Sequence, residues 1–153
     1  MNTRLDPFKA APEIFKAMLD LSGVVAASSL EHSLGELVKI RASQINGCAN
    51  CLHMHTREAR AAGETEERLH LLAAWREAPG FTARERAALA WTEALTLVAE
   101  TRAPDADYES VKAEFSDREQ VELTALIVTI NAWNRFAVGF RVQPALKVKP
   151  VAA

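Results

Sequence analysis

Cysteine is scarce in this chain: two occur among 153 residues, at Cys48 and Cys51. So low a number excludes a fold held by several disulfides, as in small secreted domains. No uninterrupted apolar run approaches the ~20 residues of a membrane-spanning helix. No glycine-rich nucleotide-binding pattern occurs either, so we expect no bound cofactor. Electrons for any redox chemistry should then come from a thiol partner.

A large charge of one sign is also missing, because the formal net charge is only -2. This balance gives no electrostatic reason to expect nucleic acid or an anionic membrane as partner. The first six residues, 1–6, lack the apolar segment of a signal peptide, and we expect a cytoplasmic location. In that reducing compartment a Cys-x-x-Cys pair is more often catalytic or metal-binding than structural.

Helical patterns fill most of the chain, whereas strand patterns are nearly absent. The length and a hydrophobic content of 49% fit one soluble globular domain spanning residues 1–153. Apolar residues at helical spacing predict an all-α bundle of about six or seven helices, with a core at about 10–142. The expected helices cover 12–22, 24–45, 48–63, 65–78, 82–98, 105–115 and a long segment from 116. The tail, 144–153, is expected to be extended or mobile.

Local signals mark several helix ends. Gly47 and Gly63 are suited to end helices, because glycine readily adopts the left-handed conformation found there. The pairs Thr82/Glu85 and Ser116/Glu119 have the form of capping boxes, in which each side chain bonds the other residue's amide.

The segment around the two cysteines carries the clearest chemical pattern. On a helix, Cys48, Cys51 and His55 share a face, because residues three and four apart are neighbours. Cys48 follows Asn46-Gly47 and should begin the helix, where unpaired amides and the helix dipole favour a thiolate. His55 is one turn after Cys51 and is suited to take its proton, directly or through water.

Two other interpretations of this segment stay open. Cys48 and Cys51 could be small apolar side chains on a half-exposed helix. Alternatively, Cys48, Cys51 and His55 could hold zinc, with His32 or Glu36 as a fourth ligand. His53 lies on another face of the helix and is a poor ligand.

The motif Cys48-x-x-Cys51-x-x-x-His55, with Glu36 twelve residues earlier, resembles the alkyl hydroperoxidase D-like (AhpD-like) core of the carboxymuconolactone decarboxylase family. Segments 36–48, 86–94 and 122–135 are also similar, and the resemblance covers about residues 10–142. It implies an all-α fold, homo-oligomeric assembly as a trimer or hexamer, and thiol-dependent peroxidase or disulfide-reductase activity.

The resemblance also implies roles for four residues. Cys51 would attack a hydroperoxide and become a sulfenic acid, which Cys48 would resolve to a disulfide. Glu36 and His55 would form a proton relay, commonly through water. A lipoyl group or thioredoxin-like protein would restore the thiols. One position departs from the best-known members, because Asn50 replaces a second histidine and cannot relay a proton at neutral pH.

Competing functions follow from the same residues. A non-catalytic redox sensor would oxidise once without turnover. A decarboxylase is less expected, because that branch of the family lacks the dithiol pair.

Further expectations concern exposure and charge around the motif. We expect Cys48 to be the exposed thiol that meets the reductant and Cys51 to be the buried one. If Glu36 is buried beside His55, its pKa should rise. Lys39 and Arg41 are expected at the surface.

The remaining histidines, His32, His53 and His70, are expected outside the site. The three tryptophans, Trp75, Trp91 and Trp133, should pack in the core or a subunit interface. Asn131 and Asn134 are expected to bond backbone at an interface rather than line a pocket.

Overall fold

The structure, a computed structural model, describes residues 2–146 and is built of helices and loops without a strand in that range. The all-α expectation is therefore confirmed. The elements are α1 (Pro7–Ala10), α2 (Pro12–Ala26), α3 (His32–Ile45), α4 (Ala49–Ala61), α5 (Glu66–Leu71), the 3-10 helix η1 (Leu72–Ala74), α6 (Ala83–Thr96), α7 (Val98–Thr101), α8 (Asp105–Glu114) and α9 (Asp117–Phe140).

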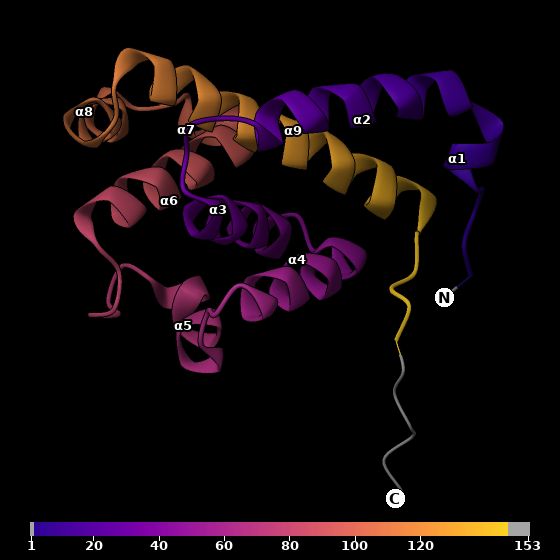
Figure 1. Ribbon diagram of the computed structural model, residues 1–153, viewed down its shortest axis with the longest axis horizontal. Helices are drawn as coiled ribbons and strands as arrows, with labels where there is room; N and C mark the ends of the chain where they lie inside the picture. Colours follow the sequence, from indigo (N-terminus) through magenta and orange to yellow (C-terminus); the bar gives the residue numbers. More distant parts are fainter. Residues whose placement is uncertain (1, 147–153) are drawn as a thin grey trace, which may run out of the picture.

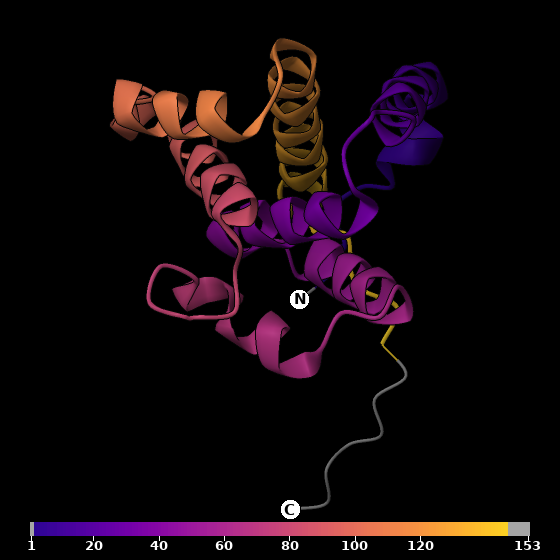
Figure 2. The ribbon, with the colours of Figure 1, turned by 60° about the vertical axis from the view of Figure 1, so that its left-hand side comes forward.

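Helix α3 occupies the centre of the molecule and contacts α4, α6 and α9 (Figure 1). Helices α2 and α9 pack side by side above it, while α4 and α5 lie below. The turned view separates α9 from the pair α6 and α8 (Figure 2). Because α3 also contacts η1 and so has four neighbours, it carries buried side chains around most of its circumference, including Leu37 and Ile40.

Two buried apolar clusters hold these helices together. One joins α2, α3, α6, α8 and α9 around Val38, Ala88 and Leu123. The other joins α3 and α6 to the segment from α5 to Phe81 and includes Leu72. Both clusters include side chains of α3, so the position of this helix is fixed from two sides. Helix α3 also carries Glu36.

The predicted helix caps are confirmed. Thr82 with Glu85 and Ser116 with Glu119 form complete capping boxes at the starts of α6 and α9. Gly47 has a φ of 65° in the turn before α4, a conformation that costs other residues more than glycine.

The predicted helix 24–45 is wrong, because the chain breaks between α2 and α3 at residues 27–31. Ser29 stabilises the break by donating from its amide and hydroxyl to Oε2 of Glu122, at 3.0 and 2.6 Å. Gly23 lies inside α2 and does not end it. The four-residue helices α1 and α7 were not predicted, and they raise the number of helices above that expected. Of the predicted tail, residues 144–146 are non-helical, while 147–153 lie outside the described residues.

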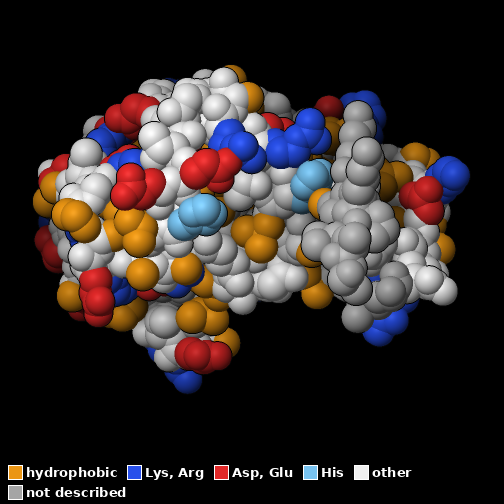
Figure 3. Space-filling view, turned by 90° about the horizontal axis from the view of Figure 1, so that it is seen from below, with side chains coloured by type: hydrophobic (Ala, Val, Ile, Leu, Met, Phe, Trp, Pro, Cys, Tyr) orange, Lys and Arg blue, Asp and Glu red, His pale blue; other side chains and the backbone are white. Residues whose placement is uncertain are grey.

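Helix α9 is long and apolar enough, by length and composition, to cross a membrane. Within the described residues it packs against α2, α3, α4, α6 and α8. Acidic and basic side chains are interspersed over the face shown in Figure 3, without an extended region of one sign.

The Ser116/Glu119 capping box predicts a pH-dependent contribution to stability. Hydrogen bonds from the Ser116 amide and hydroxyl, with help from Arg84, lower the pKa of Glu119 to about 2. A lowered folded-state pKa stabilises the native state above the unfolded pKa, and this stabilisation is lost as the pH falls. Urea unfolding should therefore show Glu119→Gln less stable than wild type above about pH 4.5, with a difference that shrinks towards pH 2. Glu109→Gln is the control, because the side chain of Glu109 is exposed. Equal changes of stability with pH in both variants would contradict the assignment of this stabilisation to Glu119.

Candidate functional site

A tight turn between α3 and α4 presents the cysteine pair. Asn46 caps the end of α3, Gly47 makes the turn, and Cys48 is the N-cap residue of α4. The amide of Cys48 donates to the carbonyl oxygen of Ser43 at 3.0 Å. These local contacts place Cys48 at the N-cap, directly before the first residue of α4, Ala49, and so within one residue of the predicted helix start.

Buried asparagines of α9 anchor this turn. Nδ2 of Asn46 donates to Oδ1 of both Asn131 and Asn134, at 2.9 Å each. Asn134 donates in turn to Oγ of Ser43 at 3.0 Å, while Asn131 donates to Oγ1 of Thr96. Asn131 also donates to the backbone carbonyl of Ile127 at 2.9 Å, so the expected backbone bond is present for Asn131, whereas the partners of Asn134 are side chains within the chain. Their role is to fix the turn that carries the dithiol.

Cys48 and Cys51 form a disulfide, with Cα atoms 5.4 Å apart. The amide of Cys51 donates to Sγ of Cys48 at 3.3 Å, which places Cys48 sulfur at the positive end of α4. Cys51 lies within the first turn of α4.

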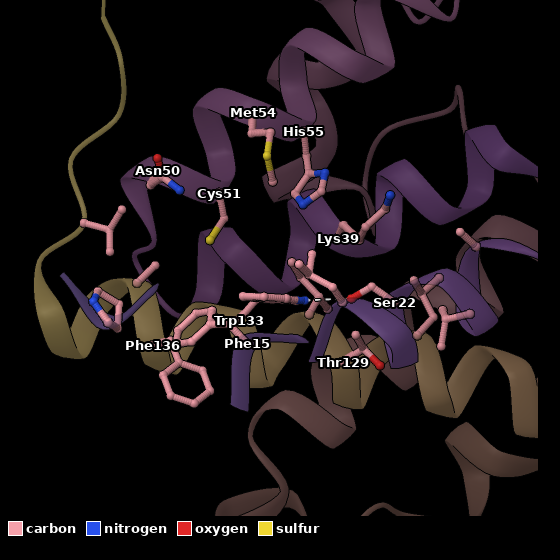
Figure 4. A pocket seen from close by; sticks show the side chains of 18 of the residues that line it. Phe15, Ser22, Lys39, Asn50, Cys51, Met54, His55, Thr129, Trp133 and Phe136 are labelled. Atoms are coloured by element: carbon pink, nitrogen blue, oxygen red, sulfur yellow. Dashed lines mark hydrogen bonds between the residues drawn. The ribbon is translucent and has the colours of Figure 1, made fainter. Parts of the chain in front are cut away.

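The expected division into an exposed Cys48 and a buried Cys51 is wrong in part. Both residues are buried, with relative exposures of 1% and 2%. Cys51 lines a pocket and Cys48 does not (Figure 4). Ala137 from α9 packs against both cysteines. Cys51 is therefore the sulfur that a small molecule in the pocket can meet.

His55 lies one turn after Cys51 and also lines the pocket (Figure 4). Its Nδ1 is 3.1 Å from Oε2 of Glu36 on α3 and 3.0 Å from Oε2 of Glu58 on its own helix. Two carboxylates at Nδ1 favour a proton there, so Nε2 is the nitrogen left to accept a proton. His55 and Glu36 are thus brought together as the spacing and the resemblance suggested.

Glu36 is buried, and its side chain is only 2% exposed. Burial by itself raises the pKa of Glu36, but hydrogen bonds from His55 and Lys39 and the positive charge of Lys39 outweigh it, so that the pKa is lowered. The expected rise is therefore wrong in direction. The missing element was Lys39, whose ammonium pairs with Oε1 of Glu36.

Lys39 and Arg41 are not the free surface charges that were expected. Lys39 lines the pocket, and its side chain is 23% exposed. Arg41 is 17% exposed and binds Glu93 at 2.8 Å. His32, expected outside the site, lies 3.7 Å from Oε1 of Glu36 at the surface.

The pocket has a volume of about 420 Å³ and a mainly apolar wall. Residues of α2 and α9 face α4 across it, and Trp133 is fixed by a 2.9 Å hydrogen bond from its indole N–H to Oγ of Ser22 (Figure 4). Trp133 therefore lines a pocket, unlike Trp75 and Trp91. The wall consists of Pro7, Phe8, Phe15, Leu19, Ser22, Val25, Ala26, Lys39, Asn50, Cys51, Met54, His55, Leu126, Thr129, Ile130, Trp133, Phe136, Ala137 and Val142.

The N-terminal segment forms part of that wall. Phe8 of α1 packs on Phe15, with ring centroids 4.2 Å apart. Arg4 ties the segment to the end of α9, donating from its amide to the carbonyl of Phe140 and from its guanidinium to that of Gly139, each at 3.0 Å. The N-terminal segment and the end of α9 thus meet beside the pocket.

Ligand atoms of Glu36, His55 and Glu58 lie within 4.8 Å of one another, a spacing that could hold a metal ion. Lys39 and the imidazole already satisfy the oxygens of Glu36, so hydrogen bonding accounts for this cluster. A zinc site with both cysteines as ligands would require the reduced form of the pair, because zinc is bound by thiolates.

Lys39 and Glu58 are the site residues that sequence reasoning missed. Each follows a recognised residue by three positions, Glu36 and His55 respectively, and so shares its helix face. That spacing was the available signal.

Comparison with known proteins agrees with this geometry. The family model described as "Carboxymuconolactone decarboxylase family" matches residues 12–94. The uncharacterized protein YdfG of Bacillus subtilis (strain 168) is 40% identical over 147 residues, which cover 96% of this chain and all of YdfG.

Two solved structures are also similar. A protein of unknown function from Agrobacterium tumefaciens, provisionally described as the antioxidant defence protein AhpD, is 49% identical, with a TM-score of 0.93 over 95% of this chain and all of that one. An uncharacterized peroxidase-related protein from Silicibacter sp. TM1040 shares the fold at 24% identity, with a TM-score of 0.78 over 88% of this chain and 72% of that one. With a family model matching more than half of its residues and this AhpD-like fold, the chain belongs to the carboxymuconolactone decarboxylase family.

Proposed function

We propose that this protein is a thiol-dependent oxidoreductase that reduces organic hydroperoxides with the Cys48/Cys51 dithiol. The observation that carries the proposal is the position of Cys51, which lies with His55 in the wall of an apolar pocket. Such a pocket fits the alkyl or aryl part of a hydroperoxide. The family membership and the AhpD-like fold support the same chemistry.

The first step oxidises Cys51. Nε2 of His55 takes the thiol proton, and the resulting thiolate attacks the terminal oxygen of the hydroperoxide. The O–O bond breaks, Cys51 becomes a sulfenic acid, and the departing alkoxide takes the proton from His55 to leave as an alcohol. Glu36 at Nδ1 keeps the imidazole oriented and stabilises its cationic form during the transfer.

The second step forms the observed disulfide. The Cys48 thiolate, stabilised by the amide of Cys51 at the start of α4, attacks the sulfur of the sulfenic acid. The S–O bond breaks, and the hydroxide leaves as water with the proton that Cys48 has released. Because the two residues share one helical turn, this step needs little movement.

A reducing dithiol closes the cycle. One of its thiolates attacks Cys51 in the pocket, and Cys48 leaves as the stabilised thiolate. The second thiol of the donor then releases Cys51. A lipoyl group would enter this narrow site more easily than a thioredoxin-like protein, since both cysteines are buried.

The same burial favours a hydroperoxide over the disulfide of a partner protein as the oxidant. A non-catalytic redox sensor is the second candidate, because the disulfide packs against Ala137 of α9, and a change in its redox state would alter this contact. Turnover distinguishes them: an enzyme cycles when reductant is supplied, whereas a sensor reacts once. Decarboxylation stays the weakest candidate.

We also propose a homo-oligomer, a trimer or hexamer, in the reducing cytoplasm. Large apolar side chains are exposed on α2 and α9, among them Val24 at 73% and Val121 at 70%. A patch of this kind is typical of a surface that another protein covers. Analytical ultracentrifugation measures the assembly directly.

Thiol counting after mixing with cumene hydroperoxide tests the peroxidase proposal. Reduced wild type should rapidly lose both of its two thiols. Cys48→Ser should stop at a sulfenic acid that dimedone traps, because the resolving thiol is missing. Cys51→Ser should react no faster than a free cysteine.

Two results would contradict the proposed roles of Cys51 and Cys48. A wild type that reacts at the rate of free cysteine, or trapping in Cys51→Ser but not in Cys48→Ser, would falsify the proposed division of labour. Repeated cycles with dihydrolipoamide, followed as loss of hydroperoxide, separate the enzyme from the sensor.

The two carboxylates on His55 predict unequal effects of mutation. Glu36 is buried, whereas the side chain of Glu58 is 49% exposed, so solvent screens its charge more strongly. In the Cys48→Ser background, Glu36→Gln should lower the rate of Cys51 alkylation by iodoacetamide at pH 7 about tenfold or more. Glu58→Gln should change it less than about threefold. Equal effects of the two substitutions would show that the greater burial of Glu36 does not make it more important than Glu58 for the reactivity of Cys51.

A further inference from the structure

Lys39 is the one lysine among the residues that line the pocket. The other lysines in ion pairs, Lys9, Lys16 and Lys112, have side chains that are 59–86% exposed, whereas that of Lys39 is 23% exposed. Covering a long charged side chain is costly unless its charge is paired. The partly buried ammonium of Lys39 therefore needs a negatively charged partner nearby.

That partner is the carboxylate of Glu36. A buried carboxylate without a cation would take up a proton, because a low-dielectric environment disfavours its charge. Its two oxygens have separate partners: Oε1 meets Lys39, and Oε2 meets Nδ1 of His55. Lys39 also lies one turn after Glu36 on α3, a position from which it reaches the carboxylate from the pocket side.

We propose that Lys39 is a positioning residue of the dithiol centre: its ammonium holds Glu36 as a carboxylate turned towards His55, and so keeps Cys51 reactive at neutral pH. This inference rests on the proposed function. Lys39 acts through Glu36 and His55 and does not itself contact a reacting atom. The lowered pKa of Glu36, to which its bonds with His55 and Lys39 both contribute, agrees with the geometry.

The charged surroundings allow the effect of removing Lys39 to be predicted. On α3 and α4 the ionisable groups that meet Glu36 or its partner His55 are His32, Lys39 and Glu58. Helices α2 and α9 present only uncharged side chains to the pocket. Lys39 is thus the one permanent cation among the described groups at this centre, and its loss favours proton uptake by Glu36, His55 and Cys51 alike.

The test compares Lys39→Met with Lys39→Arg in the Cys48→Ser background, with Lys16→Met as a control. The rate of Cys51 alkylation by iodoacetamide is measured across pH. Lys39→Met should move the profile to higher pH and reduce the rate at pH 7 about tenfold, the equivalent of one pH unit. Lys39→Arg should largely restore the profile because it keeps the charge, and Lys16→Met should match the parent.

A second measurement follows the side-chain carboxyl of Glu36 directly by ¹³C NMR. Its titration should move to higher pH in Lys39→Met. An unchanged alkylation profile in Lys39→Met would overturn the inference, as would a Lys39→Arg variant that folds yet behaves like Lys39→Met. Because alkylation requires no hydroperoxide, these results stand apart from the success or failure of the proposed peroxidase activity.

Discussion

The attachment of the α3–α4 turn to α9 is the interaction on which the site depends. Asn46 in the turn bonds two asparagines of α9, and one of these bonds Ser43 in the last turns of α3. With the turn fixed, Cys48 is the N-cap residue of α4, and the helical repeat then sets the directions of Cys51 and His55. A buried amide network has this effect because each member left without its partner carries a desolvation cost, so alternative turns are disfavoured.

Charge balance is the second constraint. Glu36 is buried, and its charge is tolerated because Lys39 and His55 each satisfy one oxygen. The three groups come from two helices that pack closely, α3 and α4. The packing that forms the core also sets the spacing of the ionisable groups, and a small shift of α4 along α3 would separate them.

Much of this architecture could be predicted from local sequence. Helix starts at Thr82, Ser116 and Cys48 depend on contacts within three residues, which a sequence pattern records directly. The break at 27–31 could not be predicted in this way, because Ser29 is held by Glu122, a residue distant in sequence.

In the candidate site, too, the features set by local sequence could be predicted, and those set by tertiary contacts could not. Cys48, Cys51, His55 and Glu36 followed from spacing and family resemblance, and they do lie together. The burial of Cys48 depends on packing against α9, and the direction of the pKa shift of Glu36 depends on where Lys39 points. Both are properties of tertiary contacts, which helical periodicity does not record.

The contact between residues 4–8 and the end of α9 beside the pocket has a consequence for how such a protein diversifies. Residues 7 and 8 form part of the pocket wall, and Arg4 holds their segment against the end of α9. None of these residues belongs to the helix pair that carries the dithiol. Substitutions at these positions can therefore alter the size and shape of the pocket while the arrangement of Cys51, His55 and Glu36 is left unchanged.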